Sequence, residues 1–219
     1  MVHPIETKPM VCVRLWRNYN HSFLFSLSLQ YFNTGVVQSV MALALQYMFL
    51  KIYGLSPMKA SEWQTFISLP WTPKVIYGIV TDCLPIFGSS KRAYVVLMGC
   101  IQGVAALMIA LFRFQNPVSV MLLSMLLNLG GAFMDVVVDG MMVVFQREDS
   151  KNGSEDLQSL SWTFYGIGGV VGCTLSAAFL TEKQGEQTGN PYICFGMISI
   201  VSFSVALSGF FIDKKVEAN

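Results

Sequence analysis

The stretch PVSVMLLSMLLNLGGAFMDVVVDGMMVVFQ, residues 117–146, runs for 30 residues with only two charged side chains, Asp135 and Asp139. A helix needs about 20 apolar residues to cross a hydrocarbon core about 30 Å thick. Asn116 precedes Pro117, which puts a capping side chain before a proline in the first helical turn. The stretch therefore predicts a helix that begins near Pro117 and spans a lipid bilayer.

The rest of the chain has the same character. Of its 219 residues, 53% are hydrophobic and 12% are charged, about half the roughly 25% usual for soluble domains. We expect an all-α membrane protein with six transmembrane helices, at about 22–50, 61–84, 93–114, 117–145, 157–181 and 191–212. Residues 22–212 would form a bundle whose partner is the lipid bilayer, between terminal tails at 1–21 and 213–219.

Prolines predict further details of these helices. Ser56 and Asn190 each precede a proline, which is again typical of a helix start. The second expected helix contains Pro70 and Pro73. Each proline removes a backbone hydrogen-bond donor, so we expect a kink at residues 69–73.

The distribution of basic residues predicts the orientation. If the N-terminus is cytoplasmic, nine lysines and arginines fall on that side of the membrane and four on the other. The nine are Lys8, Arg14, Arg17, Lys91, Arg92, Arg147, Lys151, Lys214 and Lys215; the four are Lys51, Lys59, Arg113 and Lys183. Because cytoplasmic loops carry an excess of Lys and Arg, we expect a multi-pass protein with both termini in the cytoplasm.

Composition argues against several other kinds of site. A net charge of +1 gives no reason to expect a nucleic-acid partner. The five cysteines are scattered and form no CxxC pair, so they predict neither a disulfide framework nor a metal site. The two histidines have no metal-ligand spacing. We therefore predict no metal and no cofactor.

Four polar side chains share one face of the 117–146 helix. At 100° per residue they fall within about 60° of one another; they are Ser124, Asn128, Asp135 and Asp139. A charge at membrane depth costs roughly 3 kcal/mol on insertion scales unless it meets water or a partner. We interpret this face as the wall of a water-filled pathway. The alternative for Asp139 is an interfacial position near the cytoplasmic end.

Lys74 lies inside the second expected helix, in SLPWTPKVIYGIVTD. Counted from the cytoplasmic helix ends at about 1.5 Å per residue, Lys74 and Asp139 are about 12 Å deep and Asp135 about 18 Å. An ion pair between these two helices would lower the cost of all three charges, so we expect Lys74 near Asp135 or Asp139. The alternative is that Lys74 extends alone to the interface.

A polar stripe also follows the first expected helix. Ser26, Gln30, Thr34 and Gln38 recur at steps of four, with Asn33 beside them. Polar stripes in membrane helices either bond neighbouring helices or line a cavity, and the spacing fits both.

Small residues recur at the same spacing in two other helices. Gly99 and Gly103 lie in the third, and Gly168, Gly172 and Ser176 lie in the fifth. Such spacing lets two helix backbones approach closely, so we interpret both sets as packing surfaces.

The segment GIVTDCLPIFGSSKR, residues 78–92, joins the second helix to the third. It places an acid at a helix end and two bases just beyond it. Such groups can form a charge network that breaks when helices move, so we expect a gating loop; the alternative is an ordinary basic cytoplasmic loop. The residues concerned are Gly78, Asp82, Gly88, Lys91 and Arg92.

These motifs resemble those of the folate–biopterin transporter family, a branch of the major facilitator superfamily. The resemblance is carried by LPWTPKVIYGIVTDCLPIFGSSKRAY (69–94), MDVVVDGMMV (134–143), LQSLSWTFYGIGGVVG (157–172) and GLSP (54–57). The chain departs from the family in three ways. Its basic run after Gly88 is shorter, Pro73 precedes Lys74 rather than a proline following it, and six helices replace about twelve.

The resemblance implies a transporter of folates or pteridines, coupled to protons and present here as the N-terminal six-helix half. Asp135 would accept the paired N–H donors of a pterin ring or carry the coupled proton, and Lys74 would meet a folate carboxylate. The partner would be a missing C-terminal half or a second half-transporter. The alternative is a non-transporting membrane protein that pairs with a relative through the glycines of the fifth helix.

An enzyme is the remaining class. An intramembrane aspartyl protease needs two aspartates on facing helices, so that they share a proton. Asp135 and Asp139 lie on one face of one helix, and the YD and GxGD motifs are absent. We therefore predict that the protein is not an enzyme.

The basic-residue count yields a test of topology. In a background without other cysteines, single cysteines at Ser90 and Gln187 should label from opposite sides of sealed cells, because the second and fifth helices end on opposite faces. The measurement is labelling with a membrane-impermeant maleimide. Equal labelling of both positions from outside would contradict the predicted topology.

Overall fold

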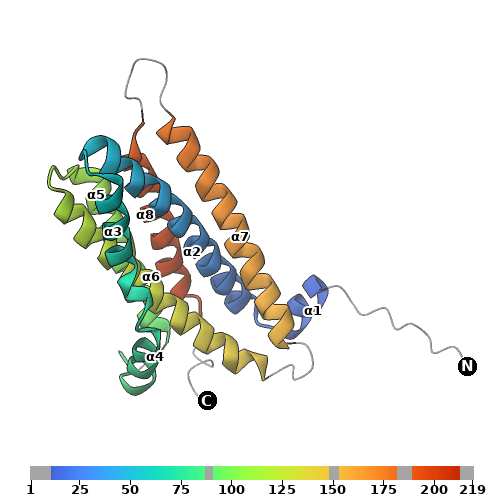
Figure 1. Cartoon of the computed structure of the whole chain (residues 1–219). Coiled ribbons are helices and arrows are strands. Elements are labelled where there is room, and N and C mark those ends of the chain that lie inside the picture. The colour runs from blue at the N-terminus through green and yellow to red at the C-terminus, as the bar shows by residue number, and fades with distance from the viewer. Residues whose placement is uncertain (1–10, 87–90, 148–152, 182–188, 213–219) are drawn as a thin grey trace, which may run out of the picture.

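A computed structural model of the chain describes residues 11–86, 91–147, 153–181 and 189–212, and these residues are mostly helical (Figure 1). The expected all-α membrane fold is confirmed, since five helices in this part of the chain are long and apolar enough to span a bilayer. They are α2 (His21–Tyr47) with its π-helical continuation η1 (Met48–Ile52), α5 (Arg92–Phe112), α6 (Pro117–Gln146), α7 (Gly153–Leu180) and α8 (Pro191–Gly209).

The second expected helix is divided where its prolines lie. It consists of α3 (Pro57–Ser68), a 3₁₀ turn η2 (Leu69–Trp71) and α4 (Lys74–Cys83). The predicted kink is thus a break, because two prolines within four residues remove two donors from the same turn. α3 and α4 still follow one another from one end of the bundle to the other (Figure 1).

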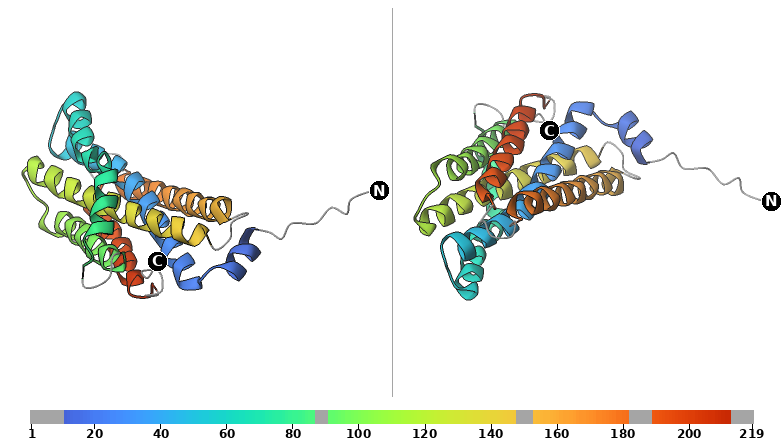
Figure 2. Two further views of the ribbon diagram at one scale, coloured as in Figure 1. Left: turned by 90° about the horizontal axis from the view of Figure 1, so that it is seen from below. Right: turned by 90° about the horizontal axis from the view of Figure 1, so that it is seen from above.

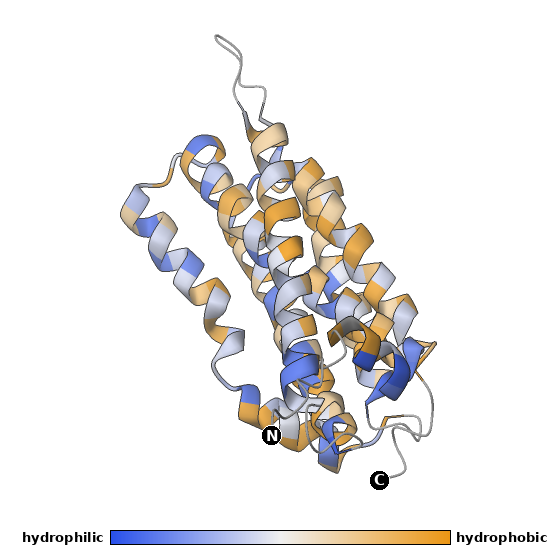
Figure 3. Ribbon diagram, turned by 90° about the vertical axis from the view of Figure 1, so that its right-hand side faces the viewer, coloured by the Kyte–Doolittle hydropathy of each residue, from blue (hydrophilic) through white to orange (hydrophobic). Residues whose placement is uncertain are grey.

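From α2 to α8, the long helices run in alternate directions along the bundle when α3, η2 and α4 are taken together as one segment (Figure 1). The start of α2 and the end of α8 therefore lie at the same end, which agrees with two tails on one side of a membrane. Hydrophobic residues dominate the long helices, and hydrophilic residues lie at this lower end and also near the opposite end (Figure 3). Which end faces the cytoplasm stays a prediction from the basic residues.

The expected capping residues hold the helix starts. Ser56 accepts from the Lys59 amide at 3.4 Å, and Asn116 accepts from the Val118 amide at 2.9 Å. Asn190 accepts in the same way from the amide two residues on, at 3.2 Å. These bonds satisfy amides that a helix start leaves without intrahelical partners.

A short helix, α1 (Val11–Asn18), precedes α2 and is held to the first turn of α7. Arg14 donates through Nε and Nη2 to the two carboxylate oxygens of Asp156, at 2.7 and 2.6 Å. Asp156 is only 2% exposed, so this two-point contact is one of the strong kind. It fixes α1 to α7.

The glycines of the fifth expected helix pack against α2, beside which α7 lies (Figure 2). A Cβ on Gly168 would lie 2.2 Å from the carbonyl oxygen of Phe32, and one on Gly35 would lie 2.1 Å from that of Tyr165. Only glycine allows two backbones to approach so closely. The face proposed for pairing with a relative is therefore already covered within the chain.

The glycines of the third expected helix pack in the same way against α8. A Cβ on Gly99 would lie 2.9 Å from that of Ala206, and one on Gly103 would lie 3.0 Å from the ring of Phe203. The packing interpretation is confirmed for both sets of glycines. The chain thus contains two close helix pairs, α2 with α7 and α5 with α8 (Figure 2).

The α2–α7 contact yields a stability prediction. Gly168→Ala should lower the free energy of unfolding by about 1–3 kcal/mol, because the new methyl group would push α7 away from α2. Gly166→Ala is the matched control, since a Cβ there would have no atom within 4 Å. The measurement is thermal unfolding of the purified chain in detergent. Equal melting temperatures for the two variants would contradict the packing assignment.

Candidate functional site

The expected ion pair between the second and fourth transmembrane segments is present. Lys74 begins α4 directly after the proline break, and its Nζ lies 2.5 Å from Oδ2 of Asp135 on α6. The lysine side chain is 38% exposed and that of Asp135 is 10% exposed. The break in the helix thus supplies the cation that a carboxylate at this depth requires.

Trp71 extends the polar contact along α6. Its indole nitrogen donates to Oδ1 of Asn128 at 2.7 Å, and Nζ of Lys74 lies 4.8 Å from the centre of its ring. The amide of Asn128 donates to the Ser124 carbonyl at 3.2 Å, which fixes its orientation. Trp71 was not predicted as a site residue, although its position three residues before Lys74 places it one turn away.

Asp139 has a different partner. Tyr31 of α2 donates its hydroxyl to Oδ1 of Asp139, one helical turn from Asp135. Tyr31 was not predicted either, because a lone tyrosine in an apolar helix carries no periodic signal. The contact places Asp139 between two helices, α2 and α6.

A cavity of about 440 Å³ opens between α2, α3 and α6, next to Trp71. Its volume lies in the range of small-molecule sites. Two of the predicted pathway residues, Gln38 and Asn128, line it. Gln64 and Ser68 of α3 supply further polar groups that were not predicted, because they lie on the mostly exposed helix before the break.

The polar stripe of α2 serves both roles expected of it: one part lines the cavity, and another bonds a neighbouring helix. Gln38 lines the cavity, and its side-chain oxygen accepts from the hydroxyl of Tyr165 at 3.0 Å. Gln30 and Thr34 do not line it: they are buried, and Thr34 donates to the Gln30 carbonyl at 3.0 Å. Asn33 bonds a neighbouring helix, donating to Gln102 of α5 at 2.9 Å.

The residues of the expected gating loop are placed apart from the cavity. Gly78 packs near Val136 of α6, and Asp82 is exposed at the end of α4. Arg92 begins α5 with its guanidinium 5.9 Å from the ring centre of Phe210. Gly88 lies outside the described residues. The charge network proposed for this loop therefore stays a prediction.

Lys91 lies beside α6. Its Nζ lies 3.8 Å from the position that a Cβ on Gly140 would take, one residue beyond Asp139. In the described part of the chain, no ion pair joins Lys91 to Asp139.

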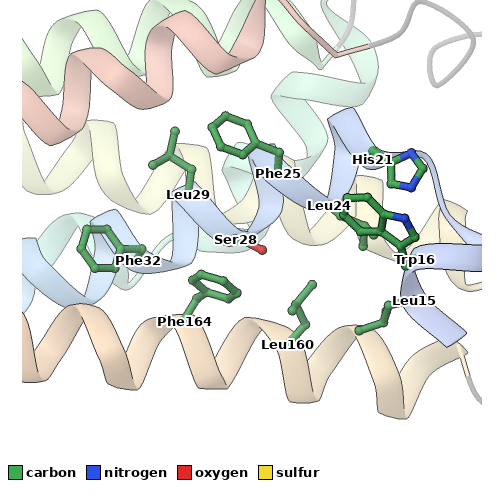
Figure 4. Close-up of a pocket in the computed structure, with 10 residues that line it drawn as sticks. All are labelled: Leu15, Trp16, His21, Leu24, Phe25, Ser28, Leu29, Phe32, Leu160 and Phe164. Atoms are coloured by element: carbon green, nitrogen blue, oxygen red, sulfur yellow. The ribbon is translucent and has the colours of Figure 1, made fainter. Parts of the chain in front are cut away.

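A second cavity, of about 640 Å³, lies between α1, α2 and α7 (Figure 4). Figure 4 shows Phe164 and Leu160 pointing from α7 toward α2, and the lining is almost entirely apolar. It lacks the convergent polar groups that orient a polar solute. Among the described residues, no group of three His, Cys, Asp or Glu side chains is placed to hold a metal ion.

Several curated proteins are similar to this chain. Probable folate-biopterin transporter 4 of Arabidopsis thaliana is 33% identical over 167 residues, which cover 75% of this chain and 34% of the relative. The folate-biopterin transporter of Synechocystis sp. is 29% identical over 150 residues, which cover 68% of this chain and 30% of the relative. Folate transporter 1 of Plasmodium falciparum is 25% identical over 179 residues, which cover 82% and 34%.

The chain thus spans about a third of the length of the curated relatives it matches. No solved structure matches it significantly. The sequence profile of the BT1 family matches residues 34–216, which include the ion pair, the cavity and both close helix pairs. The resemblance of the motifs to folate–biopterin transporters is confirmed, and the chain belongs to the BT1 family.

Proposed function

We propose that this chain forms one half of a proton-coupled transporter for pterins or folates. The observation that carries the proposal is the cavity between α2, α3 and α6, which lies beside the Trp71–Lys74–Asp135 contacts. The names of its relatives, folate-biopterin transporters and a folate transporter, supply the solute class.

The chemistry of the cavity suits a flat heterocycle with hydrogen-bonding edges. The side-chain amides of Gln38 and Gln64 each offer a donor and an acceptor. The indole of Trp71 offers an aromatic surface at the cavity wall. Lys74, whose Nζ lies 4.8 Å from the centre of that ring, supplies the positive charge that a folate carboxylate would seek.

Completion of the pathway requires further helices. A cavity open to one side would expose its amides and the ion pair to lipid, which is costly. We propose that a second six-helix half closes it, either further chain, as in the major facilitator superfamily, or a second copy. The matched residues cover 34% of one relative and 30% of another.

Uptake tests the substrate and the cavity together. In proteoliposomes, a form extended by six further helices or an assembly of two halves should accumulate labelled folate or biopterin under a pH gradient. Gln64→Leu should raise the KM about tenfold, because the loss of one hydrogen bond costs on the order of 1–1.5 kcal/mol. Gln115→Leu is the control, since Gln115 is exposed between α5 and α6, away from the cavity.

Two results would contradict the proposal in different ways. Robust uptake by this chain as a proven monomer would overturn the assignment of half a transporter, because half a cavity encloses nothing. A complete form that moves no pteridine would overturn the assigned solute class.

The ion pair yields a prediction for stability. Asp135→Asn should lower the free energy of unfolding by roughly 2 kcal/mol, less than for a fully buried pair because Lys74 is 38% exposed. Adding Lys74→Met should restore stability, since no unpaired charge then remains. The measurement is thermal unfolding, with Asp82→Asn as an exposed control. Unchanged stability in Asp135→Asn would show that the pair does not hold α4 to α6.

A further inference from the structure

The two carboxylates of α6 differ in the charge of their partners. Asp135 faces the ammonium group of Lys74 at 2.5 Å. Asp139, one turn away, faces the hydroxyl of Tyr31, which is a neutral donor. No ion pair engages Asp139 within the part of the chain that the structure describes.

The charged and titratable groups around Asp139 come from four elements. Tyr31 approaches from α2, Lys74 from the start of α4, and Asp135 from α6 itself. Lys91 approaches from the start of α5, toward Gly140. Because Lys74 is already paired with Asp135, the group of Lys74, Asp135 and Asp139 has a charge of −1 when both acids are ionised and is neutral when one proton is bound.

We propose that Asp139, and not Asp135, is the carboxyl group that binds and releases the coupled proton, and that Tyr31 is its positioning residue. The inference rests on the proposed function for its transport consequence. One proton added to Asp139 neutralises the three charges and leaves the Lys74–Asp135 pair intact. A proton added to Asp135 would instead leave Lys74 beside a neutral acid, which is the costly outcome at membrane depth.

The tyrosine makes this protonation relevant to helix movement. α2 packs mainly against α7 and α8, whereas α6 packs mainly against α5. The Tyr31–Asp139 bond is the polar contact in a junction of α2 with α6 that also includes the stacked rings of Phe23 and Phe145. A hydrogen bond to a carboxylate is roughly twice as strong as one to a neutral acid, so proton binding weakens the junction of α2 with α6.

Infrared difference spectroscopy of the purified chain in lipid bilayers tests the assignment without any transported solute. Lowering the pH to about 5.5, where exposed Asp and Glu side chains stay mostly ionised, should produce the carbonyl stretching band of a protonated carboxylic acid. Asp139→Asn should abolish this band, and the Asp135→Asn/Lys74→Met double variant should retain it. Absence of the band from the parent chain, or its survival in Asp139→Asn, would overturn the proposal.

Tyr31→Phe tests the positioning role, and it keeps the carboxyl group in place if Asp139→Asn fails to fold. The band should persist at higher frequency, because the carbonyl loses a hydrogen-bond donor. Tyr165→Phe is the matched control, since the hydroxyl of Tyr165 bonds Gln38 rather than an acid. In this variant the carboxylic acid band should keep its frequency. An unshifted band in Tyr31→Phe would exclude Tyr31 as the positioning residue.

Uptake separates this proposal from the proposed function. In a transport-competent form, Asp139→Asn should abolish accumulation driven by a pH gradient and retain exchange of labelled for unlabelled solute. A chain that shows the Asp139 band but belongs to a complete form that moves no pteridine would contradict the proposed function alone. Full pH-driven accumulation by Asp139→Asn would contradict the assignment of the proton to Asp139.

Discussion

An uncompensated charge inside a bilayer is costly in free energy, and this constraint governs the arrangement of the bundle. The Lys74–Asp135 pair compensates two such charges. The pair joins α4 to α6, with 2.5 Å between Nζ of Lys74 and Oδ2 of Asp135. The closest helix packing lies elsewhere, between α2 and α7 and between α5 and α8. The ion pair also holds Lys74 over the ring of Trp71, which bonds Asn128. The cavity wall, the ion pair and the position of α4 are thus one connected structure.

The proline break makes this structure possible. In an uninterrupted helix, each residue would turn the side-chain direction by a constant angle. The 3₁₀ turn and the new helix start at Lys74 change this angle between Ser68 and the ion pair. Ser68 and Trp71 then both reach the cavity, from either side of the turn. Broken membrane helices commonly mark solute sites for this reason, since irregular backbone is tolerated where it lines a polar space.

Hydropathy and helix periodicity were enough to predict the all-α membrane fold, the capping residues, the glycine contacts and the ion pair. They did not predict Tyr31, Trp71 and Gln64 as site residues. The contacts of these side chains are with other helices, and such contacts leave no pattern in the sequence of the helix that carries the residue. The stripe of α2 was harder still. Each step of four residues turns it by about 40°, so Gln30 and Gln38 point about 80° apart. One stripe therefore enters both the packed interior and the cavity, and only the positions of α5 and α3 show where it changes.

The close backbone contact of α2 with α7 makes these two helices a single rigid unit. Gly35 and Gly168 bring the backbones too close for either helix to slide without the other, and the Arg14–Asp156 pair adds α1 to the same rigid body. Tyr31 belongs to α2, and Tyr165, whose hydroxyl bonds Gln38 at the cavity wall, belongs to α7. A displacement that begins at Asp139 would consequently reach the cavity as a movement of the whole unit, with no need for a relay of side chains between them.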